Sequence, residues 1–98
     1  MPRVWGWGVN RVVYKYALPI EDHPVIRMPV GAIVLSVGVQ FGAPFVWAMV
    51  DPTQPGEERR FRFAGTGHPL GDFGGGARFV GTFQMDGGAL VFHLFEVA

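Results

Sequence analysis

The sequence predicts an all-β protein, folded as a single small antiparallel sandwich or barrel of about seven short strands. Three observations predict this class. Glycine (15 residues) and proline (8 residues) are frequent among the 98 residues, and one of them interrupts every stretch with a helical apolar period. Several short stretches alternate their side chains with the two-residue period of a strand. Turn residues separate these stretches, as they do in sandwiches and barrels.

The expected strands follow one another closely along the chain, and they span residues 11–17, 25–28, 32–40, 44–51, 59–64, 78–84 and 89–97. In the third strand, Ile33, Leu35, Val37 and Val39 are expected to share one face. The fourth is apolar on both faces, so a second sheet or a second subunit is expected to cover each face. In the simplest topology the fifth strand pairs antiparallel with the fourth. Before the last strand, Asp86-Gly87 predicts a hairpin turn.

The length predicts one domain. Residues 11–98 are expected to form it, and residues 1–10 are expected to be an N-terminal extension. Trp5 and Trp7 alternate with glycines in this extension. The segment is interpreted either as a flexible or edge-docked terminus or as an aromatic platform for a ligand or partner.

Composition restricts the partners. The eight basic and eight acidic residues balance, which argues against general nucleic-acid binding. The absence of cysteine excludes disulfides and cysteine zinc sites. No apolar run is long enough for a membrane helix, and the N-terminus does not resemble a signal peptide. A cytosolic protein is therefore expected, and its surplus of apolar residues favours a homo-oligomer.

The stretch from Arg59 to Pro69 holds most of the polar groups that are suited to ligand binding or catalysis. Its alternation places Phe61 and Phe63 on one strand face and Arg60 and Arg62 on the other, exposed one. Arginine binds phosphate well, glycine-rich turns present N–H groups to anions, and tryptophan stacks on bases. The predicted ligand site comprises Arg59, Arg60, Arg62, Thr66, Gly67, His68 and Trp47. Replacing Arg60 and Arg62 by alanine is expected to abolish this site and to leave the fold intact.

A simpler interpretation needs no ligand: the arginines pair with Glu57 and Glu58, and the glycines only make a turn. No metal site is expected, because the three histidines lack metal-binding spacing. His93 is expected to be a core imidazole bonded to a neighbour, and Thr66 to bond the local backbone. We therefore expect no catalytic residues, no cofactor and no enzymatic activity.

Several blocks of the chain resemble a family of small uncharacterised bacteriophage proteins. The resemblance spans about residues 14–96, and its blocks are Lys15-Tyr16-x-Leu18-Pro19-Ile20, Met28-Pro29-x-Gly31-Ala32, Trp47-Ala48-x-Val50-Asp51-Pro52, Gly65-Thr66-Gly67-His68-Pro69 and Val91-Phe92-His93-x-Phe95-Glu96. Residues 1–12 and the glycine-rich stretch 73–77 depart from the pattern without affecting these blocks.

The resemblance implies a phage origin and action in the host cytoplasm. The expected function is that of a non-enzymatic phage accessory protein that acts by binding. Our first hypothesis is an inhibitor of host antiviral defence that sequesters a phosphate-bearing nucleotide signal. The alternative is a protein-binding or structural virion (decoration) component, so the expected partner is a small nucleotide-like ligand or a host protein.

Overall fold

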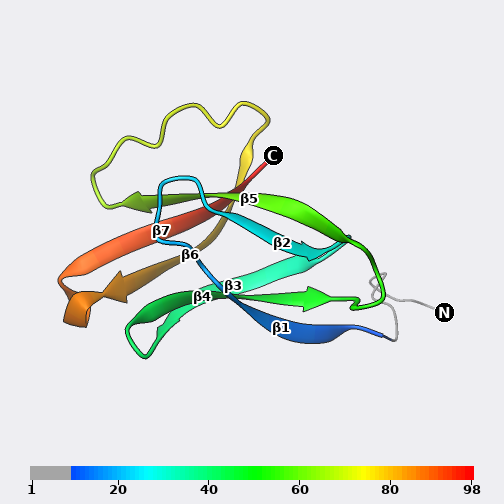
Figure 1. The fold of residues 1–98 in the computed structure, drawn as a ribbon. Helices are drawn as coiled ribbons and strands as arrows, with labels where there is room; N and C mark the ends of the chain where they lie inside the picture. Colours follow the sequence, from blue (N-terminus) through cyan, green and yellow to red (C-terminus); the bar gives the residue numbers. More distant parts are fainter. Residues whose placement is uncertain (1–9) are drawn as a thin grey trace.

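The computed structural model describes residues 10–98, and it confirms the all-β class with seven strands. Trp5 and Trp7, for which a flexible terminus or an aromatic platform is expected, lie outside this range. The strands are β1 (Val12–Ala17), β2 (Val25–Pro29), β3 (Ile33–Gln40), β4 (Ala43–Val50), β5 (Gly56–Gly65), β6 (Ala77–Met85) and β7 (Leu90–Val97), with a short 3-10 turn, η2 (Asp86–Gly88), between the last two (Figure 1).

The strands form two antiparallel sheets. The order is β1-β4-β3 in the three-stranded sheet and β2-β5-β7-β6 in the four-stranded one. The expected pairing of the fifth strand with the fourth is therefore wrong. Strand β4 has β1 on one edge and β3 on the other, so neither edge is open to β5. The polar segment 51–55 instead carries the chain from one sheet to the other.

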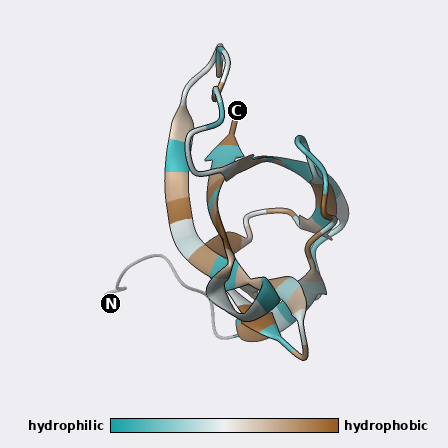
Figure 2. Cartoon of the chain, turned by 90° about the vertical axis from the view of Figure 1, so that its left-hand side faces the viewer, coloured by the Kyte–Doolittle hydropathy of each residue, from teal (hydrophilic) through white to brown (hydrophobic). Residues whose placement is uncertain are grey.

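The two sheets share one apolar core. Its members come from six of the strands and the flanking turns: Leu18, Ile26, Met28, Ala32, Val34, Val46, Ala48, Val50, Phe61, Phe63, Phe83 and Leu94. Figure 2 shows the strands arranged around a common interior, with hydrophobic and hydrophilic bands alternating along them. Phe63 packs edge-on against Phe83, with ring centroids 5.4 Å apart. Burial of these side chains supplies the main driving force for folding.

A β-bulge changes the predicted faces of β3. The register with β4 shifts between Val34 and Ser36, so Leu35 is the extra residue. As a result Val34 is buried in the core and Leu35 is 45 % exposed. The expected shared face of Ile33, Leu35, Val37 and Val39 is wrong. Ile33 pairs with the partly exposed Met49, whereas Val37 and Val39 pack against the core, because one added residue reverses the side-chain alternation.

Two hairpins connect neighbouring strands through residues with positive φ. The predicted turn before the last strand is confirmed: Asp86 has φ 54° and Gly87 has φ 64°. Between β3 and β4, only Phe41 and Gly42 form the turn, with φ of 52° and 77°. Positive φ at both central residues is the pattern of a type I′ hairpin turn, which matches the twist of the flanking strands.

Candidate functional site

Arg62 is buried, and this corrects the prediction that it lies on an exposed face. Only 8 % of the residue is accessible. Its guanidinium donates to four main-chain carbonyls, those of Phe63 and Pro69 at 2.7 Å, Leu70 at 3.2 Å and Asp22 at 3.3 Å. All three of its nitrogens are therefore engaged inside the protein. Arg62 fastens two connecting segments to the outer side of β5.

Arg59 is also occupied by internal partners. Its Nε donates to a carboxylate oxygen of Glu96 at 2.6 Å, and its Nη1 donates to the carbonyl of Ala32 at 2.7 Å. Glu57 lies 3.9 Å away. The expected pairing of the arginines with Glu57 and Glu58 is thus only partly right, because the main partner is Glu96 on β7.

The predicted ligand residues do not gather into one site. Arg60 is exposed on β5, opposite Val25 and Val97 in the sheet register. Trp47 belongs to β4, in the other sheet. Only Thr66, Gly67 and His68 lie together, in the turn that follows β5. The arginine part of the phosphate hypothesis therefore lacks the geometry that it requires.

The turn of residues 65–68 uses its own backbone donors. The N–H of His68 donates to the carbonyl of Gly65 and the N–H of Thr66 to the carbonyl of Val91, both at 3.1 Å. Gly67 has φ 85°, a conformation that favours glycine. With two donors already paired, the turn has few N–H groups left to hold an anion.

A chain of hydrogen bonds joins this turn to β6 and β7. The Thr66 hydroxyl lies 2.7 Å from Nε2 of His93, and the Thr82 hydroxyl lies 2.9 Å from Nδ1 of the same ring. This confirms that His93 is bonded to neighbours, although the ring is only partly buried. The Thr66 hydroxyl, the His93 imidazole and the Thr82 hydroxyl are connected in the same order as a nucleophile, its base and the group that orients the base. A hydrolase also needs donors for the oxyanion, and the paired N–H groups of Thr66 and His68 do not supply them.

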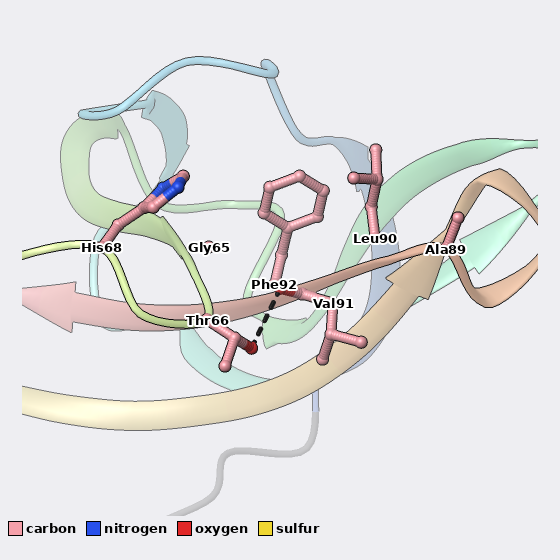
Figure 3. A pocket seen from close by; sticks show the side chains of 7 residues that line it. All are labelled: Gly65, Thr66, His68, Ala89, Leu90, Val91 and Phe92. Atoms are coloured by element: carbon pink, nitrogen blue, oxygen red, sulfur yellow. Dashed lines mark hydrogen bonds between the residues drawn. The ribbon is translucent and has the colours of Figure 1, made fainter.

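Three pockets surround the same turn. The largest has a volume of about 380 Å³ and is lined by Gly65, Thr66, His68, Ala89, Leu90, Val91 and Phe92. Figure 3 shows His68, Leu90 and Phe92 projecting to one side of β7, and Thr66 and Val91 to the other. Two pockets of about 200 and 190 Å³ also include Gly65 and His68 in their linings. The turn therefore contributes to three neighbouring pockets, while a wider and more open hollow of about 520 Å³ lies beside the C-terminal end of β7.

The long segment after the turn, residues 69–76, is fixed at several points although it is rich in glycine. Arg62 holds its first carbonyls, and the ring of Phe73 lies 5.5 Å from that of Phe95 on β7. The Asp72 carboxylate accepts from the N–H of Gly74 at 2.8 Å. This segment covers the outer side of the four-stranded sheet beside Arg62.

The three-stranded sheet has an apolar outer face, opposite its core face. On β4 the core side is fully buried, whereas Phe45, Trp47 and Met49 are partly exposed. Trp47 packs against Phe45, and its ring reaches the backbone of Gly38. Lys15 lies over the Phe45 ring at 4.6 Å. Val13 on β1 pairs with Met49 in the sheet register, and it is 56 % exposed. We call Val13, Lys15, Phe45, Trp47 and Met49 the outer aromatic face.

Phe41 stands at the end of the same sheet, in the β3–β4 turn. Its side chain is 100 % exposed, and its φ of 52° lies in the left-handed region. Asparagine, aspartate or glycine normally occupies such a position, because a large side chain there is strained. Because the ring is exposed, it also contributes no hydrophobic free energy to folding. Folding therefore does not explain this residue.

One family model matches this chain over residues 9–98, and it describes a domain of unknown function, DUF7352. The chain belongs to the DUF7352 family. The expectation of an uncharacterised family is confirmed, while the bacteriophage origin stays a prediction. No curated protein and no solved structure matches the chain.

The ionisable groups of this DUF7352 domain with shifted pKa values lie away from the turn. Hydrogen bonds from Thr53 lower the pKa of Asp51, and burial together with the nearby Tyr14 raises the pKa of Tyr16. Within residues 10–98, no group of three or more His, Asp or Glu side chains is placed to hold a metal ion. The described segment likewise has no helix with the length and apolar character to cross a membrane.

Sequence reasoning missed two features of the DUF7352 domain. The contact of Thr66 and Thr82 with His93 joins the turn after β5 to the interiors of β6 and β7, which only the sheet order brings together. Phe41 was available as a signal, because Phe-Gly between two apolar runs is an unusual choice for a two-residue turn.

Proposed function

We propose that this DUF7352 domain is a non-enzymatic binding protein that docks on another protein through Phe41 and the outer aromatic face. Phe41 carries the proposal. A fully exposed phenylalanine in a left-handed turn costs stability and invites aggregation. Its retention is understandable when the ring fills a pocket on a partner.

The outer aromatic face supports the same proposal. Aromatic residues are enriched at the centres of protein interfaces, where they supply most of the binding energy. Here Phe45 and Trp47 are held by the sheet, so binding would not have to order them. Lys15 donates to Gln40 at 2.9 Å and lies over Phe45, which gives the face a fixed positive charge. The partner chemistry that fits is an apolar pocket for Phe41 beside an acidic group.

Capture of a phosphate-bearing nucleotide, our first hypothesis from the sequence, has less support. Arg59 and Arg62 are engaged inside the protein, and Trp47 lies in the other sheet. A host protein is thus the favoured partner. Inhibition of host defence, a host cytoplasmic location and a role in the virion stay predictions from the family resemblance.

A photoreactive phenylalanine analogue at position 41 tests the proposal in cells. The matched control carries the analogue at position 58, an exposed position of the four-stranded sheet. We expect a discrete crosslinked protein from position 41 that is absent from position 58. Equal crosslinking from both positions would overturn the proposal. A crosslink only to a second copy of the chain would instead assign the face to the homo-oligomer that composition predicts.

Purified partner then allows a quantitative comparison. Phe41→Asn and Val13→Glu are expected to weaken binding by about ten-fold or more, as for central interface residues. The control is Val25→Glu, since Val25 is 45 % exposed but belongs to β2. Equal losses in all three variants would contradict the assignment of this face.

A further inference from the structure

The turn after β5 separates two pockets that together form a groove. The pocket of about 380 Å³ extends toward Ala89 and Leu90, and the pocket of about 190 Å³ extends toward Ile20, Glu21 and Asp22. Both include Gly65, His68 and Phe92 in their walls. The residues that line the two pockets include neither Phe41 nor any member of the outer aromatic face, so this site uses different residues from the proposed protein interface.

The His68 side chain lies against Gly65, and both residues line the two pockets. A Cβ atom on Gly65 would lie 2.9 Å from Cε1 and Nδ1 of His68, so the ring rests against the bare backbone of that glycine. The side chain is exposed. Among the described residues, no hydrogen bond fixes the imidazole. The ring can therefore change rotamer without moving the backbone, because exposed rotamers interconvert rapidly.

The inner wall of the groove is aromatic. Phe92 lines both pockets, and its ring centroid lies 4.8 Å from that of Phe63, which lines the smaller one. Leu90 and Ile20 continue the apolar wall at the two ends. Walls of this kind accept a planar apolar group, because ring faces and edges attract one another at such separations. A volume of a few hundred Å³ is typical of small-molecule sites.

The charges around the groove are negative. Glu21 and Asp22 are the charged residues among its lining residues, and neither pocket is lined by lysine or arginine. Asp22 is 82 % exposed along its side chain, although Arg62 lies 3.6 Å from its carboxylate. Arg62 is nearly inaccessible but offsets part of the Asp22 charge, so Glu21, Asp22 and Arg62 together leave one net negative charge beside the groove. This potential favours a cation and opposes a phosphate or carboxylate.

We infer that the groove binds a planar aromatic ligand that carries a positive charge, such as an aromatic amine. The ring would lie against Phe92 and the His68 imidazole, and the ammonium group would face Glu21 and Asp22. A nucleotide has the opposite charge and is disfavoured.

A matched pair of probes tests the inference on the full chain. Tryptamine and indole-3-acetate share one ring system and differ in the sign of their charge. Two-dimensional NMR titration should show tryptamine shifting the amide signals of Thr66, His68, Leu90 and Phe92. Two surface carboxylates make modest contributions each, so we expect tryptamine to bind about ten-fold tighter than indole-3-acetate.

Two variants decide whether the carboxylates are responsible. Glu21→Gln combined with Asp22→Asn should remove most of the preference, whereas Glu58→Gln should leave it unchanged. Both variants keep side-chain size, and the main-chain bond of Asp22 to Phe63 does not depend on the carboxylate. The inference fails if indole-3-acetate binds as well as tryptamine, if signals shift elsewhere, or if the double variant keeps the full preference. Absence of any shift at millimolar tryptamine would also overturn it.

Discussion

Val37 on β3 packs directly against the backbone of Gly81 on β6. A Cβ atom at position 81 would lie 2.9 Å from Cγ1 of Val37, closer than two carbon atoms approach in proteins. Here the two sheets lie alongside each other, and a bulge between Phe79 and Gly81 shifts the register of β6 at the same point. The glycine therefore allows the close approach of the two strands.

Gly81→Ala should lower the free energy of unfolding by about 2 kcal/mol, because the added methyl group overpacks the contact with Val37. Denaturant unfolding measures the loss. Gly38→Ala is the matched control, since a Cβ atom there would lie at an ordinary 3.4 Å from Trp47. Val37→Ala should recover part of the loss in the double variant. If Gly81→Ala and Gly38→Ala behave alike, the sheet contact is not as close as described.

Arg62→Met should destabilise the domain by about 3 kcal/mol, because it leaves buried carbonyls without their donor. It should also release residues 69–76, which hydrogen exchange and limited proteolysis would detect. Arg60→Ala is the control and should change stability by less than about 0.5 kcal/mol. The expectation that both arginines can be replaced without harm is thus revised, and equal stability of the two variants would restore it.

Thr66→Val and Thr82→Val should each cost about 1 kcal/mol, the usual net value of one hydrogen bond. Their effects should not add, because both hydroxyls bond the same His93 ring. Nitrogen chemical shifts of His93 report its tautomer, and each variant should change the tautomer balance. Fully additive losses with unchanged His93 signals would show that the three side chains act independently.

Phe41→Asn should raise the free energy of unfolding by about 1 kcal/mol, since asparagine tolerates the left-handed conformation better than phenylalanine. Thermal unfolding is the measurement. Phe41→Leu serves as the control. It keeps an apolar side chain in the strained left-handed conformation, so the free energy of unfolding should not rise. A stabilised variant that also loses its partner would show that Phe41 is kept for binding.

Stability should fall as the pH rises above the ordinary tyrosine pKa near 10, through the contribution of Tyr16. Burial raises the folded pKa of Tyr16, so the unfolded chain loses this proton first and is favoured by alkali. Tyr16→Phe should flatten the alkaline limb of the stability curve. The difference between spectrophotometric titrations of the wild type and the variant isolates Tyr16, which should ionise above the ordinary tyrosine range. A difference curve centred at or below that range would contradict the assignment.

The sequence determined the features that depend on neighbouring residues. The two-residue period of β4 places Val46, Ala48 and Val50 on one face, which is buried, and Phe45, Trp47 and Met49 on the other, which is partly exposed although a cover on both faces was expected. Asp86-Gly87 makes the turn before β7 because these residue types accept positive φ. The Gly65–His68 turn was likewise expected from its composition. Each of these depends on steric preferences that act within a few residues.

Only the tertiary structure decided the features that join distant segments. The alternation of β5 places Arg62 opposite Phe61 and Phe63, and it does not say that residues 69–70 will fold over that side and accept its hydrogen bonds. The sheet order likewise brings His93 between Thr66 and Thr82. A strand pattern defines two faces, whereas burial of each face depends on which remote segment covers it. Which segment covers a face depends on the packing of the whole chain. As a result Arg62, which the sequence predicts to bind phosphate, instead donates hydrogen bonds to main-chain carbonyls inside the protein.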